Sequence, residues 1–340
     1  MATRTTNALK LSVILIALHF VARPAAASLI ITPTFGANIT SDANASIIES
    51  SINAVIANYE SLITTSISIN VTFQEMSTGL GQTSASVYQI PYSSYVTALF
   101  NHAQSADDLT AIAQLSKSAT LDPVDGQSSV YMKGADVKAL GINFFAATHA
   151  ASEGTISLNT SIMNLSRSGN QDSAKYDLQA VVSHELDEVL GLGSSLGSGL
   201  IYASPEDLFR YAANGAGGTC STVKGRSFST SAAACFSIDG STGLAQFNNT
   251  GSGDSGDWLT PGKASNAQIQ DANGTPGTQP ALGVELRALD VIGYDLSAAG
   301  QAVVSQSQAP ATPEPATGLM IFPALGAGWA LRRRLRASRK

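Results

Sequence analysis

The sequence predicts an α+β fold, in which helices pack on a mixed sheet. Apolar residues recur with a helical period over residues 43–62, and the following segment 67–73 alternates apolar and polar residues as a half-buried strand does. A second strand-like segment, 155–159, precedes an amphipathic helix at 177–190. A helix that leads into a strand favours a layered α/β or α+β arrangement, because each element must bury its apolar side against another.

The remaining elements are short. Helices are expected over 93–104 and 106–115, between the strand-like segments. Beyond residue 215 the composition shifts to Gly, Ser, Thr and Asn, and we expect a C-terminal subdomain over about 216–296. Its predicted elements are the strands 235–238 and 244–247 and a helix at 284–292 that ends at Gly293. Residues 297–312 have no apolar period and are predicted to form a flexible linker.

Charge separates the ends of the chain from its body. The chain has 340 residues, of which 44% are apolar and only 13% charged, and its net charge is -6. Nine of the 19 Lys and Arg residues lie in the first 27 and the last nine positions, so residues 28–312 hold ten basic and 24 acidic side chains. A body with a net charge of -14 argues against binding to nucleic acid, which relies on Lys and Arg against phosphate.

Residues 1–27 are typical of a signal peptide for export. A basic start precedes the apolar run 11–22, and small residues follow up to Ala27, after which we expect cleavage. The alternative is a membrane-spanning helix, which needs about 20 apolar residues, more than this run provides.

The last 28 residues have three parts, namely Pro313, Glu314 and Pro315, the apolar stretch 316–331 and the basic cluster 332–340. This order closely resembles the PEP-CTERM sorting signal of Gram-negative bacteria. The resemblance implies an inner-membrane intermediate, processing by an exosortase-type sorting enzyme, and a final location at the cell surface or in the extracellular matrix. A plain tail anchor without processing is the alternative.

The chain has two cysteines, Cys220 and Cys235, and both fall in the part predicted to be exported. An even number of cysteines in an oxidising compartment favours one disulfide, here closing a loop rich in Ser, Thr and Gly. Metal ligation by the two thiols is the alternative, but no His or Cys lies near them in the sequence to complete a ligand set.

The helix at 177–190 carries the residues that can perform chemistry, His184, Glu185 and Glu188. His184 and Glu188 are four residues apart, so they project from one face of a helix and can reach one metal ion. A glutamate beside the first ligand can take a proton from water activated by that ion. The pattern therefore indicates a metal site with His184 and Glu188 as ligands and Glu185 as the general base.

The sequence HELDEVLGLGS, which starts at His184, resembles a degenerate form of the metzincin motif HExxHxxGxxH. His184, Glu185 and Gly191 match this motif, whereas Glu188 replaces its second histidine and Ser194 its third. A Met-turn methionine, which that family carries, is not evident. The resemblance implies a zinc ion as the cofactor.

The span 28–296 is also similar to a group of exported, PEP-CTERM-tailed proteins regarded as metalloproteases. The resemblance implies a metzincin-like (zincin) domain, with segment 155–159 as the edge strand of a substrate cleft, and a zinc-dependent endopeptidase acting on peptides or proteins. It further implies Asp207 as a third metal ligand. His149, which lies shortly before the strand at 155–159, is the other candidate for that position.

Two alternatives to an active enzyme remain open. A site of one imidazole and two carboxylates would nearly neutralise Zn²⁺ and leave its water less acidic. The first alternative is therefore a catalytically inactive zincin-fold protein of the cell surface or matrix. The second is an unrelated surface module, rich in Ser and Thr, in which the helix match is accidental.

A Gly-rich loop carries a further pair of acids, Asp254 and Asp257. Such a loop can bind calcium or form an ordinary exposed turn. Because the spacing differs from that of an EF-hand loop, we expect the exposed turn.

Overall fold

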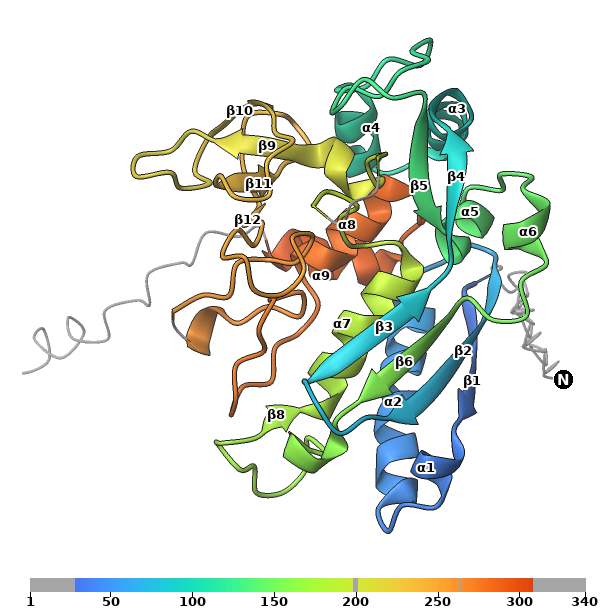
Figure 1. Cartoon of the computed structure of the whole chain (residues 1–340), viewed down its shortest axis with the longest axis vertical. Coiled ribbons are helices and arrows are strands. Elements are labelled where there is room, and N and C mark those ends of the chain that lie inside the picture. Colours follow the sequence, from blue (N-terminus) through green and yellow to red (C-terminus); the bar gives the residue numbers. More distant parts are fainter. Residues whose placement is uncertain (1–27, 198–200, 263, 308–340) are drawn as a thin grey trace, which may run out of the picture.

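The computed structural model describes residues 28–197, 201–262 and 264–307. The predicted signal peptide and sorting tail lie outside these residues. The described chain has an α+β fold with several small sheets, in agreement with the predicted class (Figure 1). Within these ranges, no helix is both long enough and apolar enough to span a membrane.

The main sheet has four strands in the order β1-β2-β6-β3. The strands are β1 (Ile30–Phe35), β2 (Ser68–Glu75), β6 (Gly154–Leu158) and β3 (Gly81–Ala85). β1, β2 and β6 run parallel, whereas β3 pairs antiparallel with β6. One side of β3 therefore has no strand partner among the described residues.

Two long helices, α2 (Ala45–Leu62) and α7 (Leu178–Leu190), cover one face of this sheet (Figure 1). Their apolar stripes have the predicted helical period. The side chains that join helices and sheet are almost completely buried and include Ile48, Ile52, Val55, Tyr59, Ile69, Val71, Phe73, Val182, Leu186 and Val189. Each contributes roughly 1.5–3 kcal/mol through its burial, so the position of α7 on the sheet is well fixed.

Both ends of α7 are set by specific residues. At its start, the side chain of Asp177 accepts a hydrogen bond from the backbone N–H of Ala180 at 3.2 Å. At its end, Gly191 has a φ of 142°, and a Cβ there would lie 3.0 Å from Ile292 and 3.2 Å from Asp136. These ends fix which residues of the helix face the core.

A second sheet is antiparallel and has the strand order β10-β9-β11-β12. Its strands are β9 (Arg210–Ala213), β10 (Val223–Arg226), β11 (Ala234–Phe236) and β12 (Ala245–Gln246). A disulfide joins Cys220 and Cys235, which confirms the predicted pairing. The buried aromatic rings of Phe236, Phe247 and Trp258 contact one another and belong to the main hydrophobic core.

Shorter elements connect these parts. β4 pairs antiparallel with β5, and β7 pairs parallel with β8. The helix α8 matches the predicted segment 284–292 and ends at Gly293. The remaining bounds are α1 (Ala37–Thr40), β4 (Val87–Pro91), α3 (Tyr92–His102), α4 (Ala106–Ile112), β5 (Ser129–Lys133), α5 (Gly134–Ala139), α6 (Phe145–Thr148), β7 (Met163–Asn164), β8 (Tyr176–Asp177), α8 (Val284–Ile292) and α9 (Ala298–Ser307), with 3₁₀ turns at Thr160–Ile162, Glu206–Phe209 and Ala264–Asn266.

The predicted edge strand is wrong. Segment 155–159 falls in β6, which lies inside the sheet between β2 and β3. The edge is formed by β3, whose sequence GQTSA has no alternation of apolar residues and gave no strand signal. Pairing with β6 and a bond from Thr83 to α7 hold this strand in place.

The predicted linker also differs, because its first part is the helix α9. Gly300 and Val304 are buried where α9 packs on α2 and α8. A Cβ at Gly300 would lie 2.5 Å from the carbonyl oxygen of Leu62, so this packing requires glycine. With so few buried positions, the segment shows no apolar period although tertiary contacts make it helical.

Asp290, a buried acid on α8, is expected to make stability depend on pH. Burial and the neighbouring Asp108 raise the pKa of Asp290 from 3.8 to about 8. The folded state then holds more protons than the unfolded state between about pH 4 and about pH 8, so stability falls as the pH rises through this window. In Asp290→Asn we expect the stability to fall less over this pH range. At about pH 8 its melting temperature should be several degrees higher than that of the wild type.

Thermal unfolding at about pH 5 and about pH 8 measures this effect. Asp172→Asn, at an exposed position, is the matched control and should keep the wild-type slope. An unchanged slope in Asp290→Asn would contradict the assignment.

Candidate metal centre

A cleft of about 690 Å³ lies between β3, α7 and the loop region 253–280. β3 and α7 form two of its walls, and the loops between β12 and α8 form the third. Its charged and ligating lining residues include His184, Glu185, Glu188, Asp254, Asp257 and Asp271. The cleft therefore brings the chemically competent face of α7 together with a loop about 70 residues later in the sequence.

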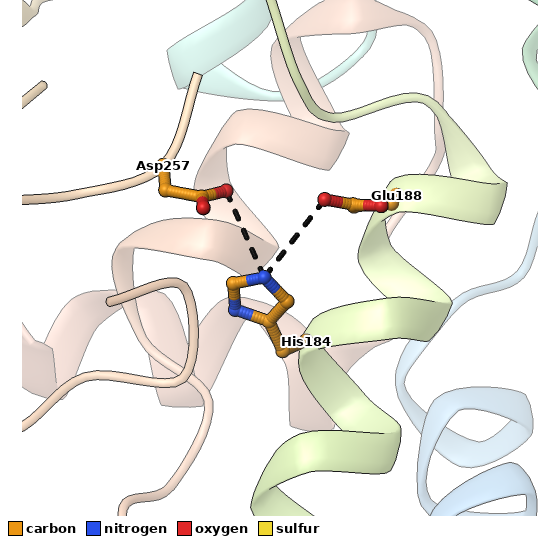
Figure 2. A group of neighbouring side chains, drawn as sticks. All are labelled: His184, Glu188 and Asp257. Carbon is orange, nitrogen blue, oxygen red and sulfur yellow. Dashed lines mark ion pairs between the residues drawn. The ribbon is translucent and has the colours of Figure 1, made fainter. Parts of the chain in front are cut away.

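Three of these side chains converge on one point (Figure 2). The Nε2 atom of His184 lies 3.9 Å from Oε1 of Glu188 and 3.7 Å from Oδ1 of Asp257. The ligand atoms of the three residues all lie within 4.8 Å of one another. His184 and Glu188 meet because they are one helical turn apart on α7, and Asp257 reaches them from the loop that precedes Trp258.

Surrounding groups hold two of the three side chains. Nδ1 of His184 lies 3.0 Å from the carbonyl oxygen of Ile269, so this nitrogen carries a hydrogen, and Nε2, which faces Glu188 and Asp257, is the nitrogen that would bind an ion once its own proton is displaced. The side-chain amide of Gln270, which is fully buried, donates to Oδ1 of Asp257 at 3.0 Å. The bonds to Ile269 and Gln270 fix the direction of an imidazole and a carboxylate, as around many metal sites.

The pKa values follow from an excess of negative charge at this point. Burial lowers the pKa of His184, but the carboxylates of Asp257, Glu185 and Glu188 outweigh it and raise the pKa to about 9. Burial raises the pKa of Asp257 to about 7, and it also raises that of Glu188. Each carboxylate is thus costly in its charged form unless a cation joins the group.

Glu185 turns from α7 toward the edge strand. Its Oε2 lies 2.8 Å from the hydroxyl of Thr83, and its carboxylate contacts the backbone of Gly81 closely. Burial raises the pKa of Glu185 to about 7. A carboxyl group with a pKa near neutrality, at the wall of the cleft beside His184, suits a general base and acid.

Gly81 leaves the space that Glu185 occupies. A Cβ at this position would lie 2.3 Å from Oε1 of Glu185 and 2.7 Å from Cγ1 of Val181. Gly81→Ala must therefore displace Glu185, and we expect at least about a tenfold loss of any activity that needs this carboxylate. Gly262→Ala is the control, since a Cβ there meets nothing within 4 Å.

Hydrolysis assays of the two alanine variants, with circular dichroism to verify folding, test this expectation. Full activity in a folded Gly81→Ala protein would show that the position of Glu185 is unimportant.

The other predicted ligands do not join the group. The carboxylate of Asp207 is buried and accepts hydrogen bonds from Ser194, Ser195 and Ser204, so it anchors the loop after α7. His149 is exposed at the end of α6, where its ring stacks on Phe145 with a centroid distance of 4.2 Å. Neither lines the cleft.

Asp257 is the site residue that sequence reasoning missed. Asp254 is exposed, as expected for a turn, and its carboxylate accepts a bond from the backbone N–H of Gly256 at 2.7 Å. Asp257 is instead only 3% exposed, which contradicts the predicted exposed turn. One signal could have indicated this: Asp257 is followed directly by Trp258, whose large apolar side chain is completely buried.

The three residues fit a divalent cation. A neutral imidazole nitrogen and carboxylate oxygens are usual zinc ligands, and donors about 2.1 Å from a tetrahedral ion are roughly 3.4 Å apart. The observed separations from Nε2 of 3.7 Å and 3.9 Å exceed that value by only a few tenths of an ångström. Because the ligand atoms of all three residues lie within 4.8 Å of one another, side-chain movements would close the site around an ion without a change in the backbone.

The chain matches no family model, no curated protein and no solved structure.

Proposed function

We propose that this protein is a metal-dependent peptide hydrolase in which His184, Glu188 and Asp257 hold a divalent ion of the zinc class. The observation that carries the proposal is the convergence of these three side chains inside a cleft, next to Glu185. The bond from His184 to Ile269 supports it, because it leaves Nε2 free to act as a ligand.

The proposed chemistry needs little movement of the protein. The ion, when bound, supplies Lewis acidity that lowers the pKa of water and polarises a carbonyl oxygen. Glu185 takes a proton from the attacking water, and the water oxygen forms a bond to the carbonyl carbon of the substrate. Glu185 then delivers the proton to the leaving nitrogen as the C–N bond breaks, which yields one carboxylate and one amine.

An extended peptide is the substrate form that the cleft favours. β3 lines the cleft through Gly81 and Thr83 and has an unpaired side within the described chain. A peptide segment can add to such an edge through backbone hydrogen bonds. This arrangement would place a peptide bond beside His184 and Glu185.

The metzincin-like character of the fold is part of the proposal. It is supported by a mixed sheet with one antiparallel edge strand, by the motif helix α7 packed on that sheet, and by the turn at Gly191 that ends the helix. The location is also proposed from the sequence, as export followed by PEP-CTERM sorting. The disulfide between Cys220 and Cys235 supports an oxidising compartment.

A second candidate function is a surface or matrix protein with the same fold and no catalysis. The observation that favours it is the ligand set, because Glu188 and Asp257 bring two negative charges to the ion and reduce its Lewis acidity. This candidate predicts no hydrolysis, whether or not the site still takes up an ion.

Metal analysis and a protease assay on the purified protein separate the possibilities. The proposed enzyme should contain about one zinc-class ion per chain and hydrolyse casein, and a chelator should remove both properties. Bound metal without hydrolysis would favour the inactive surface protein. A metal-free protein that does not take up Zn²⁺ would overturn the hydrolase, and hydrolysis that a chelator abolishes would overturn the inactive surface protein.

A further inference from the structure

Asp271 lies on the loop wall of the cleft. Its segment is held to the loop that carries Asp257 by an isolated parallel bridge between Asp271 and Trp258. Gln270 turns inward to its hydrogen bond with Asp257, whereas Ile269 and Asp271 line the cleft. Asp271 therefore faces the space that a substrate would enter.

Only one of the two carboxylate oxygens of Asp271 has a hydrogen-bond partner among the described residues. Its Oδ2 atom accepts a hydrogen bond from the backbone N–H of Gln268 at 2.9 Å. The buried Oδ1 atom has no hydrogen-bond partner within the described ranges, and the residue is only 3% exposed. A buried carboxylate oxygen in this state is unfavourable until a donor, preferably a cation, reaches it.

The charge of the cleft also favours a cationic ligand. Six described residues that line it are acidic, and none of its described lining residues is Lys or Arg. Glu188 and Asp257 would compensate a divalent ion, and Asp177 pairs with Arg167, but no described Lys or Arg pairs with Asp271. The cleft therefore keeps excess negative charge even with an ion in place, on Asp271 as well as on Glu185 and Asp254.

Apolar groups beside Asp271 suit the stem of a long cationic side chain. Ile269 and Ala272 line the cleft next to it. Lys and Arg bury their methylene groups against apolar surface while the charged end seeks a carboxylate. An acidic side chain would meet repulsion at the same place.

We propose that Asp271 forms a subsite for the Lys or Arg side chain of a peptide substrate, so that the enzyme prefers cationic peptides. The inference rests on the proposed function and names the substrate class of that site. Asp271 would act on specificity and contributes no ligand to the ion.

Peptides that are identical except for one position test the subsite. Each position on both sides of the cleaved bond carries Lys, Ala or Glu in turn, and kcat/KM is measured with the zinc-loaded protein. At one position we expect Lys to exceed Glu by at least about tenfold, the size expected for a buried charge pair. Asp271→Asn keeps an acceptor for Gln268 and should remove most of this preference while zinc content stays unchanged.

A binding assay supplies a readout that needs no turnover. Fluorescence anisotropy of labelled Lys and Glu peptides is measured with zinc-loaded Glu185→Gln protein, with and without Asp271→Asn. Asp254→Asn, a change of the same kind at an exposed position of the cleft, is the matched control and should keep the preference for Lys. Asp271→Ser serves as a second variant if Asp271→Asn is poorly folded.

The outcomes separate the two proposals. Equal binding and turnover of Lys and Glu peptides, or an unchanged preference in Asp271→Asn, overturns the subsite and leaves the hydrolase intact. Selective binding of Lys peptides that depends on Asp271, without cleavage by the wild type, supports the subsite and overturns the hydrolase.

Discussion

Asp257→Asn is expected to abolish stoichiometric binding of a divalent ion. Asp257 supplies one of only three converging ligands, and its Oδ1 lies 3.7 Å from Nε2 of His184. Asparagine has nearly the same shape and still accepts the hydrogen bond from Gln270, but it removes the negative charge that attracts the ion. Since loss of a mere supporting residue weakens metal sites by about 10–100-fold, loss of a ligand should cost at least about 100-fold in affinity.

Competition of the purified variants with a chromogenic chelator measures this loss. Asp254→Asn is the matched control, because it removes the same charge three residues away at an exposed position outside the ligand group. It should bind the ion with nearly wild-type affinity. Equal affinities for Asp257→Asn and the wild type would show that the ion, if bound, is held elsewhere.

Much of the fold is predictable from local periodicity. The predicted helices at 43–62 and 177–190 agree within a few residues with α2 and α7, because both bury one apolar stripe against the sheet. β2 was predicted for the same reason, through its alternating buried residues. In each of these elements the local pattern and the tertiary environment favour the same structure.

Elements without an apolar pattern were missed, and they matter for the site. β3 consists of small and polar residues, and its Gly81 and Thr83 both contact Glu185 closely and line the cleft. Its sequence therefore lacks the alternation of apolar residues by which a strand is predicted. α9 was missed because Gly300, needed for a close approach to α2, contributes no apolar side chain.

Only the residues of the candidate site that lie on one helix could be predicted from the sequence. His184, Glu185 and Glu188 follow from helical spacing, and the structure places them together at the cleft. Asp257 lies in a loop rich in Gly and Ser, whose path depends on contacts such as the pairing of Trp258 with Gln270. Such long-range contacts leave no local period, so sequence reasoning had no basis for choosing Asp257 over Asp207.

Glu185→Gln is expected to reduce hydrolysis by roughly 10²–10⁴-fold while leaving metal binding intact. Glutamine fills the same space beside Gly81 and retains a side-chain oxygen that can accept a hydrogen bond from Thr83, but it cannot take a proton from water. Because Glu185 is not one of the three converging ligands, the zinc content should stay near one ion per chain.

Glu185→Gln should lose hydrolysis and keep the metal, so the two measurements together distinguish loss of the general base from loss of the ion. Metal analysis and casein hydrolysis are measured on the same preparation, with Gln82→Glu, a charge change on β3, as a control for altered cleft charge. The hydrolase predicts metal-loaded, inactive Glu185→Gln beside an active control, whereas the inactive surface protein predicts no hydrolysis in any of them, the wild type included. If Glu185→Gln hydrolyses casein at the wild-type rate, the proton must be taken by another group and the role of Glu185 is refuted.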